Sequence, residues 1–146
     1  MIEKMLNNYE RFQNELEADL DLLQRMLQQD MPDLSPGDTV ALGKRLKQLK
    51  ACADFVQNEE IDRRVEHAEL RFRQLSYLDW MIKSRPQYEQ EMIQTLWVEK
   101  LSVTQAAERL FISRSAVYRR KQKVLVGLEA LIKENDWLLG LWDELE

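Results

Sequence analysis

The chain has little of what long loops, strands and secreted folds require. Its 146 residues include four glycines, three prolines and one cysteine. So few turn-forming residues leave little loop material, and the one cysteine, Cys52, cannot form an internal disulfide. No apolar run is long enough to cross a membrane, and no signal-peptide pattern is present at the N-terminus. These absences favour a cytoplasmic protein, in which we expect Cys52 to be a small buried residue.

Helix-forming residues dominate the composition instead. Leu, Glu, Gln, Lys, Arg and Ala are abundant, and no segment shows the sustained apolar–polar alternation typical of strands. Because 45% of the residues are hydrophobic, the chain can bury a core. The sequence therefore predicts an all-α fold: long N-terminal helices, as a possible coiled coil or helical hairpin, followed by a helix-turn-helix.

Apolar residues at steps of three and four predict a first helix from residue 2 to about residue 29. This N-terminal stripe consists of Ile2, Leu6, Tyr9, Phe12, Leu16, Leu20, Leu23 and Leu27. It can be intramolecular core or a dimer interface, and the spacing is not a clean heptad. A loop is expected at 30–37, which holds two prolines and a glycine.

Two further helical stretches are predicted after this loop. The second begins near Asp38 or Thr39, either of which can cap it, and runs to Ile82, with a break left open at 58–60. The third opens at Ser84, which we expect to cap it in a capping box with Gln87. Its buried face is expected to comprise Met92, Ile93, Leu96 and Trp97.

Charge is distributed unevenly along a chain whose net charge is −5. Residues 1–36 carry eight acidic and three basic side chains, and residues 127–146 carry six acidic and one basic. Residues 100–126 carry seven basic side chains and only one acidic one, Glu108. Because salt screens charges beyond about 10 Å, this local charge, rather than the net charge, decides where a polyanion binds.

The basic segment also has the pattern of two short helices joined by a tight turn. Ser102 or Thr104 can cap the first helix, and the small residues Ala106 and Ala107 allow a close helix–helix approach. Ser113 can cap the second helix, whose inward face comprises Val117, Val124 and Leu128, while Leu110 and Ile112 flank the turn and point inward. This combination predicts a helix-turn-helix that binds double-stranded DNA.

The outward face of the second helix carries residue types suited to DNA recognition. The residues expected to face the bases are Arg114, Ser115, Tyr118, Arg119 and Gln122. Those expected at phosphates are Thr104, Ser113, Arg120, Lys121 and Lys123. The alternative is a helical hairpin with a solvated basic face, which charge runs usually indicate.

Residues 97–120 resemble the helix-turn-helix of sigma-factor region four, and residues 61–128 resemble the ArpU and RinA group of phage late transcription regulators. The resemblance implies a small sequence-specific DNA-binding protein that regulates phage or prophage transcription, with the base-facing set named above. The alternative is the small subunit of a phage terminase, which recognises DNA for genome packaging and usually forms rings. Phe111 departs from the family pattern, because glycine is common there and the turn often has φ > 0. Either the turn differs, or packing of the ring compensates for the strain.

No enzymatic chemistry is indicated by the sequence. No glycine-rich phosphate loop and no nucleophile–base pair is found, and one histidine, His67, with one cysteine cannot make a zinc site. We expect no catalytic residue, no metal and no cofactor, and we expect His67 to be exposed or partly packed.

The chain is divided by function into three segments. Residues 1–60 are expected to form a helical or oligomerisation region, 61–130 the DNA-binding domain, and 131–146 an acidic amphipathic segment with Leu138, Leu141, Trp142 and Leu145 on one face. Trp137 and Trp142 either dock on the body of the protein or contact a partner such as RNA polymerase. A homodimer is a further expectation, since two half-sites give useful affinity.

Overall fold

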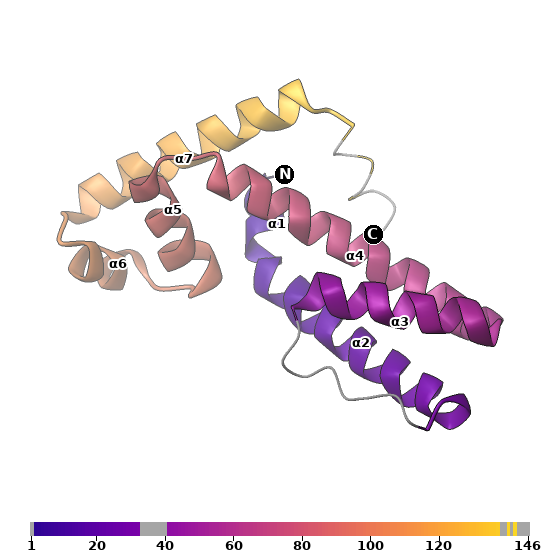
Figure 1. The fold of residues 1–146 in the computed structure, drawn as a ribbon. Coiled ribbons are helices and arrows are strands. Elements are labelled where there is room, and N and C mark those ends of the chain that lie inside the picture. The colour runs from indigo at the N-terminus through magenta and orange to yellow at the C-terminus, as the bar shows by residue number, and fades with distance from the viewer. Residues whose placement is uncertain (1, 33–40, 138–139, 141, 143–146) are drawn as a thin grey trace. The chain divides into compact units, whose positions relative to one another are not determined.

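The computed structural model describes residues 2–32, 41–137, 140 and 142, and this part of the chain is all-α, as predicted. It contains no strand. The elements, shown in Figure 1, are α1 (Ile2–Asn7), α2 (Tyr9–Asp30), α3 (Leu42–Val56), α4 (Glu59–Lys83), α5 (Gln87–Ile93), the π-helical turn η1 (Gln94–Val98), α6 (Val103–Leu110) and α7 (Arg114–Glu134). The predicted caps at Asp38 and Thr39, most of the predicted loop at 30–37, and Leu138, Leu141 and Leu145 lie outside the described residues.

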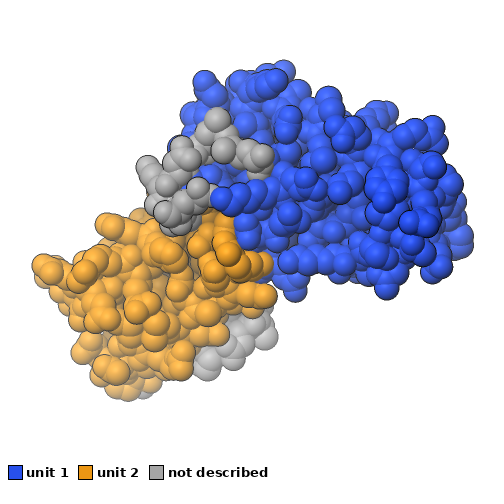
Figure 2. Space-filling model, turned by 180° about the vertical axis from the view of Figure 1, so that it is seen from behind, with its two compact units in different colours: residues 1–10, 75–146 blue, residues 11–74 orange. Residues whose placement is uncertain are grey.

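Two compact units make up the chain, and Figure 2 shows them in different colours. Unit 1 comprises residues 1–10 and 75–146, and unit 2 comprises residues 11–74. The bounds of these units differ from the functional boundaries expected near residues 60 and 130. The functional division stays a prediction.

Unit 2 is a set of three helical segments from α2, α3 and α4. Its apolar core contains Phe12, Leu16, Leu20, Leu23, Leu27, Leu46, Leu49, Ala53, Ile61, Val65 and Ala68. Polar contacts also join the helices: the buried Arg45 of α3 binds Asp21 of α2 at 2.6 Å, and the exposed His67 of α4 contacts Asp19 of α2 at 2.8 Å. The predicted apolar stripe of α2 is therefore core within the chain.

Unit 1 brings the first helix of the chain against the last ones. Helix α1 packs on α7 and η1, and α5, α6 and η1 pack on one another or on α7. The core contains Ile2, Met5, Leu6, Leu78, Met81, Met92, Ile93, Trp97, Ala106, Val117, Val124 and Leu128. The N-terminal ten residues thus belong to the same unit as the basic segment.

The first predicted helix is interrupted at Asn8. Its N–H bonds the carbonyl of Met5 at 3.2 Å, and its side-chain amide donates to the carbonyl of Lys4 at 2.8 Å. In a continuous helix the Asn8 N–H would bond this Lys4 carbonyl, so the side-chain bond replaces the helical one and favours an interruption. Helix α1 therefore ends at Asn7, and α2 begins at Tyr9.

The boundaries of α4 and α5 settle one open prediction and correct another. Asn58 breaks the second helical stretch, and its side chain accepts hydrogen bonds from the N–H groups of Glu60 and Ile61 at the start of α4. Ser84 does not cap α5: its hydroxyl donates to the carbonyl of Met81 at 2.6 Å in the last turn of α4. Helix α5 instead begins at Gln87 after Pro86, without a side-chain cap.

Candidate nucleic-acid interface

The turn between α6 and α7 has the local geometry that the sequence predicts. Ser102 caps α6 in a capping box with Gln105, and Ser113 caps α7 by accepting a hydrogen bond from the N–H of Ala116 at 3.1 Å. Each cap satisfies a backbone donor that the first turn leaves free. Ala106 and Ala107 are buried where α6 packs, whereas Leu110 and Ile112 are only half-buried.

Phe111 carries the positive φ of the turn while its ring is exposed. Its backbone is left-handed, with φ 56° and ψ 43°, so the turn does not differ from the family pattern. The side chain is 94% exposed, and the expected compensation by packing of the ring is therefore wrong. A left-handed conformation costs a bulky residue about 1 kcal/mol, and nothing among the described residues offsets this cost through ring burial.

The predicted base-facing side chains share one exposed face of α7. Arg114, Ser115, Tyr118, Arg119 and Gln122 are all exposed, opposite the buried Val117, Val124 and Leu128. Neither Arg114 nor Arg119 forms an ion pair with any described residue. The structure thus brings these five residues together, with two guanidinium groups available to an anion.

The predicted phosphate-binding residues fall into different environments. Thr104 is exposed in the first turn of α6, and the Ser113 hydroxyl accepts the capping bond but keeps its own proton to donate. Lys121 points to another side of α7, where its Nζ lies 3.3 Å from a carboxylate oxygen of Glu3 and 5.9 Å from the centroid of the Trp97 ring. Helix α1 therefore already supplies a counter-charge to Lys121.

Arg120 and Lys123 lie beside Tyr88 of α5, a residue that sequence reasoning missed. The Nζ of Lys123 donates to the Tyr88 hydroxyl at 3.0 Å, and this bond raises the pKa of Lys123. The Arg120 guanidinium lies 5.7 Å from the centroid of the same ring. No sequence pattern links Tyr88 to residues more than thirty positions away, so only the packing of α5 on α7 reveals the contact.

A largely buried ion pair lies next to this contact, where α5 approaches α7. Arg85 binds Glu89 through three contacts of 2.9–3.2 Å, and the Glu89 side chain is 1% exposed. The Arg85 guanidinium lies directly over Gly127, where a Cβ would come within 2.5 Å of it. The absence of a side chain at Gly127 thus makes room for the guanidinium.

The two C-terminal tryptophans differ in exposure. Trp142 is 7% exposed, whereas Trp137 is 56% exposed and packs edge-to-face on Tyr77 of α4, with ring centroids 4.9 Å apart. Trp142 is thus docked, and Trp137 keeps about half of its surface available.

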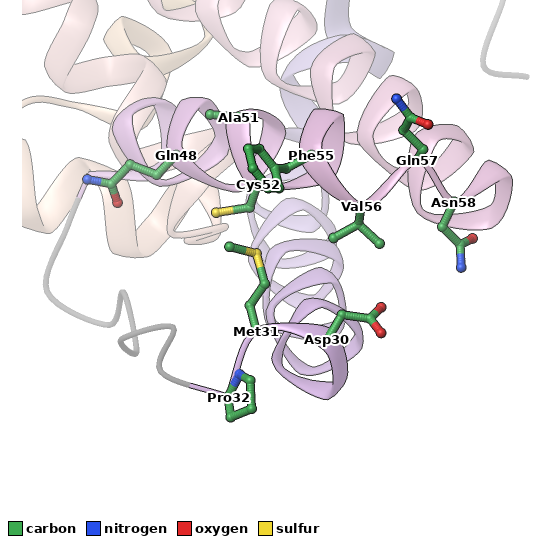
Figure 3. Close-up of a pocket in the computed structure, with 10 residues that line it drawn as sticks. All are labelled: Asp30, Met31, Pro32, Gln48, Ala51, Cys52, Phe55, Val56, Gln57 and Asn58. Carbon is green, nitrogen blue, oxygen red and sulfur yellow. The ribbon is translucent and has the colours of Figure 1, made fainter.

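Unit 2 contains a hollow among its described residues. It lies at the ends of α2 and α3, where Cys52 and Met31 contribute to its lining (Figure 3). Cys52 is half-buried, so the expectation of a buried cysteine is corrected. Its described lining carries one carboxylate, Asp30, and no base to pair with the thiol, and the described residues contain no group of three or more metal-binding side chains.

Searches of protein-family models, curated proteins and solved structures found no match to this chain. Among the described residues, no helix has both the length and the apolar character needed to span a membrane.

Proposed function

We propose that this chain binds double-stranded DNA in a sequence-specific manner, with α7 in the major groove. The observation that carries the proposal is the exposed face of α7, where Arg114 and Arg119 have no acidic partner among the described residues. Bidentate arginines are the commonest readers of guanine, and the first turns of the second helix are the part of a helix-turn-helix that enters the groove.

The remaining side chains have roles that follow from their positions. Ser115, Tyr118 and Gln122 lie on the same exposed face and can reach base edges. In this proposal Thr104, Ser113, Arg120 and Lys123 contact phosphates to the sides of that face. Lys121 contributes to phosphate binding only if it exchanges Glu3 for the phosphate.

The biological role that fits this binding is regulation of transcription in a phage or prophage. The support is the resemblance of residues 97–120 to sigma-factor region four. Contact with RNA polymerase or another protein falls to Trp137 in this proposal, because Trp142 is buried. No catalytic step, metal or cofactor is needed.

Fluorescence anisotropy of labelled duplexes over a salt series tests the proposal. The wild type is expected to bind with an affinity that falls steeply as salt rises, and Arg114→Ala with Arg119→Ala should weaken binding at least about 30-fold, since each bidentate contact contributes about 1–3 kcal/mol. The matched control is Lys83→Ala with Lys133→Ala, which removes two exposed charges of unit 1 away from the face.

The control should bind within about threefold of the wild type, because it loses long-range charge but no contact. Equal losses in both double variants would mean that only net charge matters, and absence of binding at low salt would reject the proposal. Sequencing genomic fragments bound by the wild type then separates a promoter-proximal site from a packaging site, and a mass measurement separates a monomer or dimer from a terminase-like ring.

A further inference from the structure

A second polar cluster lies at the junction of α5 and α7, beside the base-facing residues. It consists of Tyr88, Arg120 and Lys123. Both cationic groups approach the same ring, at 5.7 Å for the Arg120 Cζ and 5.6 Å for the Lys123 Nζ, measured to the centroid. Two cations three residues apart on a helix repel each other, and neither forms an ion pair with a described acidic residue.

The nearest buried carboxylate does not neutralise this cluster. Glu89 lies one residue from Tyr88 on α5, but its carboxylate is occupied by Arg85. Arg120 and Lys123 therefore keep their charge available to a ligand from outside the chain.

The hydroxyl of Tyr88 completes a set of converging donors. Its oxygen accepts a hydrogen bond from Lys123, so its own proton remains free to be donated. Tyr88 is 41% exposed, so the hydroxyl can be reached from solvent. Guanidinium, ammonium and phenol donors on one surface match the oxygens of a phosphate group, each of which accepts hydrogen bonds.

We propose that Tyr88, Arg120 and Lys123 together bind a backbone phosphate, so that α5 as well as α7 contacts the DNA. This inference rests on the proposed function and deepens it: Tyr88 becomes a phosphate-contacting residue and holds Lys123 in position. This phosphate belongs to the DNA strand that borders the groove on the side of α7 that faces α5. The position of this contact fixes the rotation of α7 in the groove, as backbone contacts do in other complexes.

The test combines Tyr88→Phe with Lys123→Ala in a double-mutant cycle, read by anisotropy over a salt series. Lys123→Ala should reduce the slope of log affinity against log salt by about one, the value for one lost phosphate contact. Tyr88→Phe keeps the ring and the charge, so it should weaken binding about fivefold, the effect of one hydrogen bond, and leave the slope unchanged. The double variant should lose less affinity than the product of the single losses, because the two residues act on one phosphate.

Tyr77→Phe and Lys133→Ala are the matched controls, since they make the same chemical changes elsewhere in unit 1. Neither should alter the affinity by more than about twofold, the scatter of substitutions outside an interface. If Tyr88→Phe binds like the wild type, or if Lys123→Ala leaves the slope unchanged, the cluster does not contact phosphate.

These outcomes separate the inference from the proposed function. When the wild type binds and the Arg114 and Arg119 double variant does not, a null result at Tyr88 and Lys123 overturns the inference alone. When the wild type does not bind duplex DNA at all, both are overturned.

Discussion

Replacing Gly127 by alanine should destabilise the protein, although helix propensity alone predicts the opposite. Alanine in a helix interior is favoured over glycine by about 1 kcal/mol. At Gly127, however, the added Cβ would lie 2.5 Å from Nη2 and 2.6 Å from Cζ of Arg85. Real Cβ contacts are not this short, so the guanidinium must move.

Moving Arg85 is costly because of what it binds. Its partner Glu89 is 1% exposed, and removing one member of a buried ion pair costs about 3–5 kcal/mol because the other charge stays buried. Because Gly127→Ala displaces Arg85 rather than removing it, this cost is an upper limit, and after the gain in propensity is subtracted the substitution should lower the free energy of unfolding by at most about 4 kcal/mol. Urea unfolding followed by circular dichroism measures this change.

Two control variants isolate the cause. Gly140→Ala adds a methyl group with no described neighbour within 4 Å, so it should not lower the free energy of unfolding. With Arg85→Ala and Glu89→Ala already present, Gly127→Ala should instead stabilise by about 1 kcal/mol, because only propensity remains. Our reasoning is refuted if Gly127→Ala in the wild-type background is as stable as the parent.

Two further predictions concern the turn and the first helix. Phe111→Gly should raise the free energy of unfolding by about 0.5–1 kcal/mol, because glycine relieves the left-handed strain. Phe111→Ala keeps the strain and loses a ring that is 94% exposed, so it should be nearly neutral in the same urea assay. A large loss of stability in Phe111→Ala would mean that the ring is packed. Burial of Tyr9, and then its hydrogen bond of 2.5 Å to Asp79, raise the pKa of its phenol. The folded pKa therefore exceeds the unfolded value of about 10, so this stability is present below pH 10 and is lost as the pH rises toward the folded pKa. Between pH 9 and 11, the wild type should lose stability more steeply than Tyr9→Phe, and parallel curves would contradict the assignment.

The parts of the structure that could be predicted are those that local sequence determines. The apolar stripe from Ile2 to Leu27 is buried except for the half-buried Tyr9, because a period of three to four residues defines one face of a helix wherever that helix packs. The caps at Ser102 and Ser113 were predictable for the same reason, since a capping side chain and the backbone N–H that donates to it lie within three residues of each other.

The parts that could not be predicted depend on contacts between distant residues. Ser84 is an exception, because its hydroxyl donates to the nearby carbonyl of Met81 in the last turn of α4 instead of capping α5. Lys121 has the sequence signature of a phosphate ligand, yet Glu3, at the other end of the chain, pairs with it. Tyr88 carries no signature of its own and acquires a role only where α5 meets α7.

The distribution of acidic residues favours the proposed DNA-binding face of α7 over an ordinary solvated one. A solvated helix usually alternates the two signs of charge, because pairs at i and i+4 stabilise it, but α7 has no acidic residue between Arg114 and Leu128. Among the described acidic residues, Glu3 pairs with Lys121 and Glu99 pairs with Arg109. Arg114, Arg119, Arg120 and Lys123 are left without a described acidic partner on one continuous part of α7. Because their mutual repulsion destabilises the free protein, a polyanion along α7 would bind and stabilise it at the same time.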